Sequence, residues 1–356
     1  MSGYVGRLAP SPTGALHLGN VRTFMIAWLR ARSLGGKVIF RMEDLDHPKD
    51  KPGAAVQAVE DLKWLGFDWD EEYVQSRRKA IYRAALEALQ RAGRAYPCVC
   101  SRRDVEAAQS APHAGEQLYY PGTCRGRFAG WGEAQAFLEG ALGSIGSIGS
   151  LGSIGSVGSV GSLGSVGSRG SIGSVGSRGS VGARTPCWRF AVEPGARVAF
   201  DDVFAGRYEQ DVAATLGDFP LARDEFGAGY TLACTVDDLL TGVTEVVRGD
   251  DLLAATPAQI LLARALAASD RTLGLRRETP RYCHVPLVVG RDGKRLAKRH
   301  GDTRVATYRE RGKTPEEIIG FLAWSCGWAE SGERVSLRDL LPRFDLGTIP
   351  QTPFMI

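Results

Sequence analysis

A loop at residues 10–20, rich in proline and glycine, constrains this chain more than any other segment, because it lies between an expected strand and an expected helix. Residues 3–8 predict a short strand, and apolar residues recur at helical spacing over 21–31. A loop of this kind in an α/β protein presents the unpaired N–H groups of the helix to an anion. It therefore predicts a phosphate site with His17 beside it, and a solvated surface turn is the alternative.

The pattern after this loop favours a parallel sheet. Residues 37–42 predict a second strand, and apolar residues at 56–65 and 81–89 predict two helices that glycines end. Strand, helix, strand, helix is the order that builds parallel sheets. The fold class expected is therefore α/β.

The second half of the chain adds a basic loop to this pattern. Residues 285–289 predict a buried strand, followed by a tight turn and by four Lys or Arg residues within 294–300. A run of cations is usually a solvated face, so the loop alone does not decide its role. Two helix starts are also predicted, one with Thr256 as the cap residue before Pro257 and one with a capping box over 314–317.

Composition excludes several classes of protein. The chain has 356 residues and a net charge of +4, which allows about two domains and demands no nucleic-acid partner. We see no apolar run of membrane-spanning length and no secretory signal, so we expect a cytoplasmic protein without a membrane partner. Seven cysteines suit reduced thiols or a metal site better than a disulfide framework.

A low-complexity repeat interrupts the chain. Thirteen Gly-Ser-x triplets run from Gly143 to Val181, with an aliphatic residue or Arg at x. The absence of proline from the triplets argues against a collagen helix. We expect a flexible linker, with a self-associating β-like segment as the alternative, and assign it no catalytic role.

Two short motifs place the chain near a known family. His17-Leu18-Gly19-Asn20 and the basic residues 295–299 resemble the His-Ile-Gly-His and Lys-Met-Ser-Lys-Ser motifs of class I aminoacyl-tRNA synthetases. Longer blocks resemble the glutamyl group of that family, at residues 7–14, 41–46, 230–238 and 242–251. The resemblance implies a Rossmann-type parallel-sheet catalytic domain with a small zinc module and a short helical C-terminal unit.

The resemblance also implies an organisation along the chain. Two halves of the nucleotide-binding catalytic domain flank a zinc module and the repeat, and a helical unit follows. The expected boundaries are 1–94 and 183–301 for the two halves, 95–130 for the zinc module, 143–182 for the insertion and 302–356 for the helical unit.

The same resemblance implies an adenylate-forming ligase that uses ATP, Mg²⁺ and L-glutamate. A glutamate pocket needs cations for two carboxylates and an anion for the ammonium group. The resemblance assigns catalysis to His17 and Lys298, and ATP binding to Pro10, Gly19, Asn20, Arg295 and Lys298. Glutamate binding falls to Arg7, Leu8, Ala9, Pro10, Ser11, Glu43, Tyr230 and Arg248, with Asp44 or Asp46 orienting neighbours. An ordinary surface salt bridge is the alternative for Glu43 with Arg41.

Two residues depart from the motifs. Asn20 stands where the second His is usual, and Ala297 stands where Ser is usual. The Asn20 side chain still offers an amide, whereas Ala297 removes a hydroxyl that would touch phosphate. We expect activity to survive because Lys298 keeps its charge.

Cysteines form a second candidate site. Cys98, Cys100, Tyr120 and Cys124 match the spacing that a subgroup of the glutamyl family uses for one structural Zn²⁺, which is typically four-coordinate. Tyr119 and His113 are competing fourth ligands, and free buried cysteines are the alternative to a zinc site. The remaining cysteines lack such spacing and are interpreted as core or isolated thiols, namely Cys187, Cys234, Cys283 and Cys326.

The chain after the basic motif is short. Only 58 residues follow Lys298, so we expect no anticodon-binding domain. The chain thus resembles a short branch of the glutamyl family that activates glutamate without tRNA and transfers it to queuosine in the anticodon loop of tRNA(Asp). The alternatives are a shortened glutamyl-tRNA synthetase that charges a tRNA 3′ end and a non-catalytic tRNA-binding relic. We expect a monomer.

Overall fold

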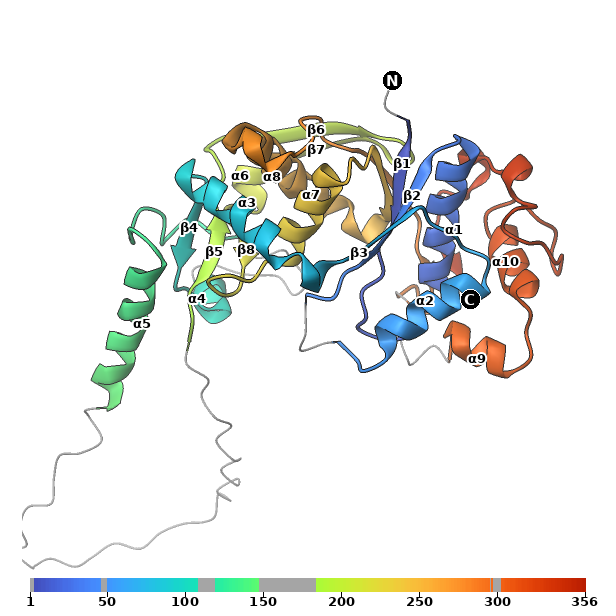
Figure 1. The fold of residues 1–356 in the computed structure, drawn as a ribbon, viewed down its shortest axis with the longest axis horizontal. Coiled ribbons are helices and arrows are strands. Elements are labelled where there is room, and N and C mark those ends of the chain that lie inside the picture. Colours follow the sequence, from blue (N-terminus) through green and yellow to red (C-terminus); the bar gives the residue numbers. More distant parts are fainter. Residues whose placement is uncertain (1–2, 46–49, 108–118, 147–183, 295, 297–301) are drawn as a thin grey trace, which may run out of the picture.

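The computed structural model describes residues 3–45, 50–107, 119–146, 184–294, 296 and 302–356. Figure 1 shows an elongated molecule in which strand β4 and helix α5 lie near one end and helices α9 and α10 near the other. Most of the Gly-Ser-x repeat lies outside the described residues, and helix α5 (Trp131–Gly146) includes its first four residues.

A parallel sheet forms the first half of the catalytic region. Strands β1 (Val5–Leu8), β2 (Lys37–Met42) and β3 (Glu71–Val74) pair in that order, all parallel. Helices α1 (Leu18–Ser33) and α2 (Ala54–Trp64) connect them in sequence. The predicted α/β order is therefore confirmed. Helix α3 (Lys79–Arg91) follows β3 after a 3₁₀ turn at Gln75–Arg77.

The second half of the chain continues this arrangement. Strands β9 (Glu245–Gly249) and β10 (Arg281–Val285) pair in parallel, and the backbone N–H of Thr244 donates to the Val5 carbonyl at 2.9 Å. Strand β9 therefore runs beside β1, which joins the two halves. Helices α7 (Tyr230–Leu240) and α8 (Thr256–Ser269) accompany β9.

An antiparallel region separates the two halves along the chain. Strands β4 (Ala95–Cys98), β5 (Cys187–Phe190) and β8 (Phe219–Ala222) form one sheet, in that order. Short helices and a hairpin complete the region, namely α4 (Arg102–Ala107), α6 (Val212–Thr215), β6 (Arg197–Asp202) and β7 (Gly206–Asp211).

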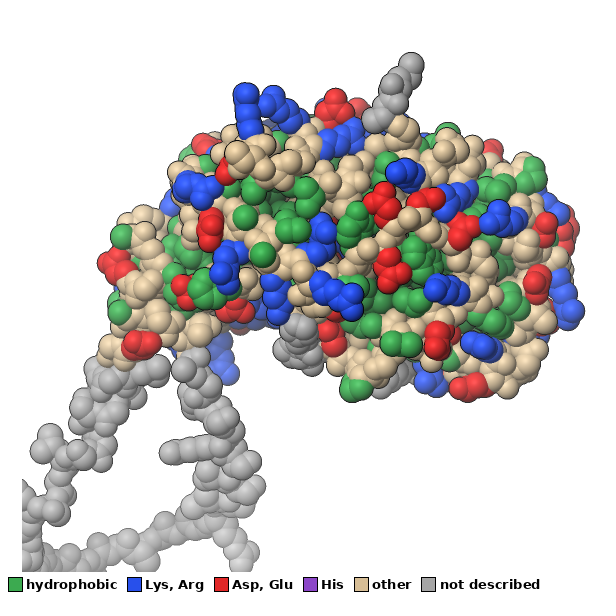
Figure 2. Space-filling view, in the orientation of Figure 1, with side chains coloured by type: hydrophobic (Ala, Val, Ile, Leu, Met, Phe, Trp, Pro, Cys, Tyr) green, Lys and Arg blue, Asp and Glu red, His purple; other side chains and the backbone are tan. Residues whose placement is uncertain are grey.

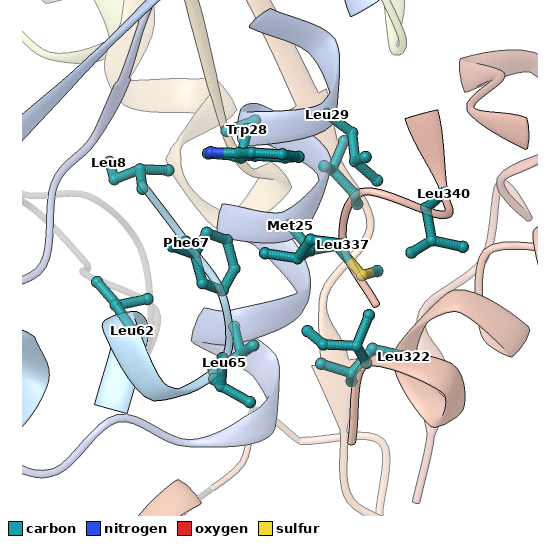
Figure 3. Packing of buried hydrophobic residues seen from close by; sticks show 14 of the residues in the cluster. Leu8, Met25, Trp28, Leu29, Leu62, Leu65, Phe67, Leu322, Leu337 and Leu340 are labelled. Carbon is teal, nitrogen blue, oxygen red and sulfur yellow. The ribbon is translucent and has the colours of Figure 1, made fainter. Parts of the chain in front are cut away.

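The C-terminal segment packs into the core of the first half. Figure 3 shows Leu322, Leu337 and Leu340 facing Met25 and Leu29 of α1. This burial ties the segment to the sheet that carries β1. Its elements are α9 (Val305–Glu310), α10 (Pro315–Trp324), β12 (Phe354–Met355), which pairs with β11 (Val288–Val289), and the 3₁₀ turns Leu341–Arg343 and Leu346–Thr348.

Two local predictions are corrected and one is confirmed. The strand predicted over 285–289 is two strands, β10 and β11, because Pro286 and Leu287 stand between them. Thr256 is the first helical residue of α8 and Ala255 is its cap, because the 3₁₀ turn Asp250–Ala255 leads directly into the helix. The capping box is confirmed: Thr314 accepts from the Glu317 N–H, and Glu317 accepts from the Thr314 N–H.

One described segment, Asp250–Ser269, reaches membrane-spanning length with a mean hydropathy of 1.4, contrary to the sequence prediction. Its apolar side chains, among them Ile260, Leu262 and Leu266, are buried in the same core as α3 and α7. The segment is thus apolar because it packs inside the fold. On the face shown in Figure 2, basic and acidic side chains are interspersed, in keeping with the small net charge.

Candidate active site and cysteine cluster

One large cavity lies where the parallel strands end. Its volume is about 1240 Å³, and its walls come from the loop after β1, the start of α1, the residues after β2 and the end of β9. Ligands of α/β proteins characteristically bind at the carboxyl ends of such strands. The predicted residues that line it are Arg7, Ala9, Pro10, Ser11, His17, Gly19, Asn20, Glu43, Tyr230 and Arg248.

The start of α1 forms one wall. His17 is the residue before the helix, and the Asn20 Oδ1 accepts the His17 backbone N–H at 3.3 Å. A Cβ atom at Gly19 would lie 3.1 Å from the His17 ring, so glycine lets the imidazole pack against the helix. Asn20, the departure from the usual motif, is therefore the N3 residue of a capping box in which His17 is the N-cap.

The basic motif is only partly described. Lys298, Arg295 and Ala297 lie outside the described residues, whereas Leu296 lines the cavity. Beyond the motif, the chain returns to the first loop: the Leu18 N–H donates to the Thr303 carbonyl at 3.1 Å, and the Val305 N–H donates to the Leu16 carbonyl at 2.9 Å. Described residues on both sides of the basic motif therefore border the cavity.

Arg7 lines the cavity and is held by the end of β9. Its Nη1 donates to the Val247 carbonyl at 2.7 Å, while its buried Nε has no hydrogen-bond partner among the described residues. This nitrogen forms an ion pair with the Asp238 carboxylate, whose Oδ1 lies 3.9 Å away. The Asp238 carboxylate therefore offsets the charge of the buried Nε, and Arg7 brings a cation to the wall of the cavity.

Glu43 is held by a buried charge network. Arg41 donates to its Oε1 from Nη2 at 2.9 Å and from Nε at 3.2 Å, and Arg41 Nη1 reaches Asp238 at 2.5 Å. The side chains of Arg41 and Glu43 are only 2% and 8% exposed. Burial alone would lower the pKa of Arg41, but Asp238 and Glu43 hold it well above its usual value. The alternative of a surface salt bridge is therefore wrong.

The remaining predicted glutamate contacts fall into three groups. Arg248 is buried and Tyr230 is 44% exposed at the opening, and both line the cavity. Leu8 does not line it, because its side chain packs in the core. Asp44 accepts from the N–H and the hydroxyl of Ser76, so it orients the turn after β3, and Asp46 lies outside the described residues.

The predicted cysteines come together in a separate small core. The Sγ atoms of Cys98, Cys100 and Cys124 lie within 4.8 Å of one another. The Tyr120 Oη lies 3.1 Å from the Cys98 Sγ and 3.5 Å from the Cys100 Sγ. Tyr120 can approach because Gly217 has a φ of +63°, and a Cβ there would lie 2.1 Å from the Tyr120 carbonyl oxygen. His113 lies outside the described residues.

The donor set fits a tetrahedral zinc ion. Zinc–sulfur bonds of about 2.3 Å place sulfurs about 3.8 Å apart in a tetrahedron, and the Cys100 and Cys124 sulfurs are 3.6 Å apart. Arg189 donates from Nε to the Cys98 Sγ at 3.3 Å and lies over the Tyr120 ring.

Sequence reasoning missed two cysteines. Cys187 is the cross-strand partner of Cys98, and the hydrogen bond to Cys98 lowers the pKa of Cys187 to about 7. Cys234 donates its thiol to Glu43 Oε1 at 3.0 Å. Neither cysteine is isolated, and spacing along the chain gave no signal because both contacts join distant residues. Cys283 and Cys326 are buried in the core, as predicted.

Comparison with known families agrees with this geometry. A family model described as tRNA synthetases class I (E and Q), catalytic domain, matches residues 5–129 and 177–340. Together these ranges hold both motifs, the cavity residues and the cysteine cluster.

Individual relatives are similar over nearly their whole length. The glutamyl-Q tRNA(Asp) synthetase of Symbiobacterium thermophilum is 41% identical over 362 residues, covering 99% of this chain and 95% of that protein. The protein of the same name from Rhodopirellula baltica is 39% identical over 381 residues, covering 100% and 97%. Among solved structures, glutamate-tRNA synthetase from Elizabethkingia anophelis aligns with a TM-score of 0.72 at 25% identity, covering 100% of this chain and 68% of that one.

Proposed function

Because the chain belongs to the glutamyl-Q tRNA(Asp) synthetase family of class I tRNA synthetases, we propose that it activates L-glutamate with ATP and transfers the glutamyl group to queuosine in tRNA(Asp). It is a ligase that forms glutamyl-adenylate without needing tRNA for that step. The observation that carries this proposal is the convergence of Arg7, Glu43 and Arg248 in one cavity with the start of α1.

Glutamate recognition follows from the charges in the cavity. The guanidinium groups of Arg7 and Arg248 supply cations for the two carboxylates, and Glu43 supplies the anion for the ammonium group. Charge-assisted hydrogen bonds of this kind contribute about 1.5–3 kcal/mol each. Tyr230, at the opening, and the backbone of Ala9, Pro10 and Ser11 complete the proposed glutamate pocket.

Activation is an in-line attack of a glutamate carboxylate oxygen on the α-phosphorus of ATP, which releases pyrophosphate. His17 and the N–H groups at the start of α1 lie on the wall where the phosphates would bind. Lys298 and Arg295 are proposed to neutralise the phosphates, because the residues that flank their segment line the cavity. Mg²⁺ would supply further neutralisation of phosphate charge, and the protein contributes mainly positioning.

Transfer then needs a nucleophile from the tRNA. A hydroxyl of queuosine attacks the acyl carbon of the adenylate, AMP leaves, and the hydroxyl proton passes to the site or to solvent. The wide cavity leaves room for a base of the anticodon loop beside the bound glutamate. Since the acceptor is tRNA(Asp), we propose that the reaction takes place in the cytoplasm. We also propose that the protein acts as a monomer.

The cysteine cluster is proposed to hold one structural Zn²⁺. Cys98, Cys100, Cys124 and Tyr120 would be its ligands, and the ion would tie β4 to the turn that follows Tyr120. Its contribution is to folding, since the cluster lies in its own core and lines no part of the cavity.

The test of this function is transfer of labelled glutamate to tRNA with and without queuosine, followed by nuclease digestion to locate the label. We expect label on the anticodon loop of queuosine-containing tRNA(Asp) only. Label at the 3′ adenosine would instead identify a shortened glutamyl-tRNA synthetase. Glutamate-dependent pyrophosphate exchange without tRNA is also expected. A shortened glutamyl-tRNA synthetase should show exchange only when tRNA is added, and a non-catalytic relic should show none.

A further inference from the structure

A buried carboxylate and imidazole stand directly behind Arg248. The Asp202 Oδ2 lies 2.6 Å from the His284 Nδ1, and both side chains are fully buried. On the other side of the ring, the Arg248 Nε donates to the His284 Nε2 at 3.0 Å. Neither Asp202 nor His284 lines the cavity, so neither touches substrate.

The hydrogen bonds define the tautomer of His284. Burial and the neighbouring Arg248 lower the pKa of His284, so its ring is neutral at neutral pH. Burial opposes the charge of Asp202, but hydrogen bonds from the His284 side chain and from backbone N–H groups hold its pKa below the usual value. With Asp202 ionised, Nδ1 carries the proton and Nε2 is free to accept from Arg248.

Two nitrogens of Arg248 are thus held from behind. The Nη2 donates to the Thr256 hydroxyl oxygen at 2.7 Å, and that oxygen lies 3.1 Å from both the Leu252 carbonyl and the His284 Nε2. Among the described residues, Nη1 has no such bond, and Arg248 lines the cavity. The planar guanidinium is therefore fixed with one edge available to a carboxylate.

We propose that Asp202 and His284 are positioning residues that orient Arg248 to bind a carboxylate of glutamate. This inference rests on the proposed function, because it concerns the same pocket. Asp202 keeps the proton of His284 on Nδ1, so that Nε2 accepts from the Arg248 Nε and the free edge of the guanidinium faces the cavity. Losing this arrangement of hydrogen bonds weakens glutamate binding and leaves ATP binding unchanged.

Asp202→Asn tests whether Asp202 determines which nitrogen of His284 carries the proton. The Asp202 Oδ1 accepts the backbone N–H groups of His284, Phe204 and Ala205, so an Asn oxygen remains there and its NH₂ faces the His284 Nδ1. The His284 ring then carries its proton on Nε2, so two N–H groups face each other and the hydrogen bond from the Arg248 Nε is lost. We expect the KM for glutamate in pyrophosphate exchange to rise about ten- to hundredfold, with the KM for ATP unchanged. Asp201→Asn, an exposed neighbour on the same strand, is the matched control.

A pair of His284 variants separates positioning from packing, and decides the matter if Asp202→Asn does not fold. His284→Gln keeps an acceptor for Arg248, so its KM for glutamate should stay within about threefold of that of the unaltered protein. His284→Leu has no acceptor, and its KM for glutamate should rise by more than this. Two results would overturn the inference: an equal rise in the KM for glutamate in both His284 variants, or a KM in Asp202→Asn within twofold of that in Asp201→Asn. In either case, exchange by the unaltered protein would still support the proposed function. No exchange by the unaltered protein would overturn both.

Discussion

The cavity and the cysteine cluster are built in opposite ways. Arg7, Glu43 and Arg248 stand far apart in the chain, and the parallel strands bring them to one edge. Cys98, Cys100, Tyr120 and Cys124 lie within 27 consecutive residues, and their donor atoms come together in one small core. The cavity therefore depends on the whole fold, whereas the cluster depends on a short segment and, we propose, on a metal ion.

The charges differ as well. In the cavity, the buried charges already have protein partners: Arg41 donates to Glu43 and Asp238, and Arg248 donates to His284 and Thr256. In the cluster, the donors face one another and share hydrogen bonds. Altering the cavity should therefore change activity with little loss of stability, and altering the cluster should do the reverse.

The largest expected effect is at Lys298. Lys298→Ala removes a cation that we assign to the phosphates, so glutamate-dependent pyrophosphate exchange should fall by about 10²- to 10³-fold, with the melting temperature unchanged. The exposed Lys294→Ala is the control and should keep exchange. Normal exchange in Lys298→Ala would mean that Lys298 does not bind the phosphates in the cavity.

Glu43→Gln comes next. The substitution deletes the proposed partner of the substrate ammonium, and we expect the KM for glutamate to rise about tenfold to hundredfold. Exchange kinetics over a range of glutamate concentrations measure the effect, and Glu60→Gln on the exposed face of α2 is the control. An unchanged KM would place the ammonium site elsewhere.

Cys98→Ser tests whether the cysteine cluster holds a structural zinc ion. Loss of one ligand should abolish stoichiometric zinc in metal analysis and lower the melting temperature by at least about 5 °C, while exchange at low temperature stays near its normal level. Cys187→Ser is the matched variant, because Cys187 pairs with Cys98 across the strands but is outside the proposed ligand set. Zinc retained in Cys98→Ser, or lost in Cys187→Ser, would show that the ligands are assigned wrongly.

The smallest effect is expected at Asn20. Asn20→Ala removes the N3 side chain of the capping box at the start of α1, which should destabilise the protein by about 0.3–1.5 kcal/mol and leave the KM for ATP nearly constant. Thermal unfolding and exchange at varied ATP concentration distinguish the two roles of this residue. A raised KM for ATP without a change in stability would mean that the amide contacts phosphate instead.

Much of the fold was accessible from local patterns. The strands and helices of the first half were predicted because their apolar periodicity and glycine ends are local signals, and the Thr314 capping box was predicted for the same reason. The strand predicted over 285–289 was wrong because periodicity does not register a break at Pro286. Thr256 was wrongly taken as a cap because a 3₁₀ turn precedes α8.

The sequence by itself determined the parallel order of the first strands, the cysteine spacing and the blocks that mark the family, since each is written in neighbouring residues. Only the tertiary structure decided that Glu43 is buried against Arg41 and Cys234, and that Asp202 and His284 stand behind Arg248. The physical reason is that these contacts cross between strands and helices far apart in the chain. Their partners are chosen by the packing of the sheet, and residue spacing carries no record of it.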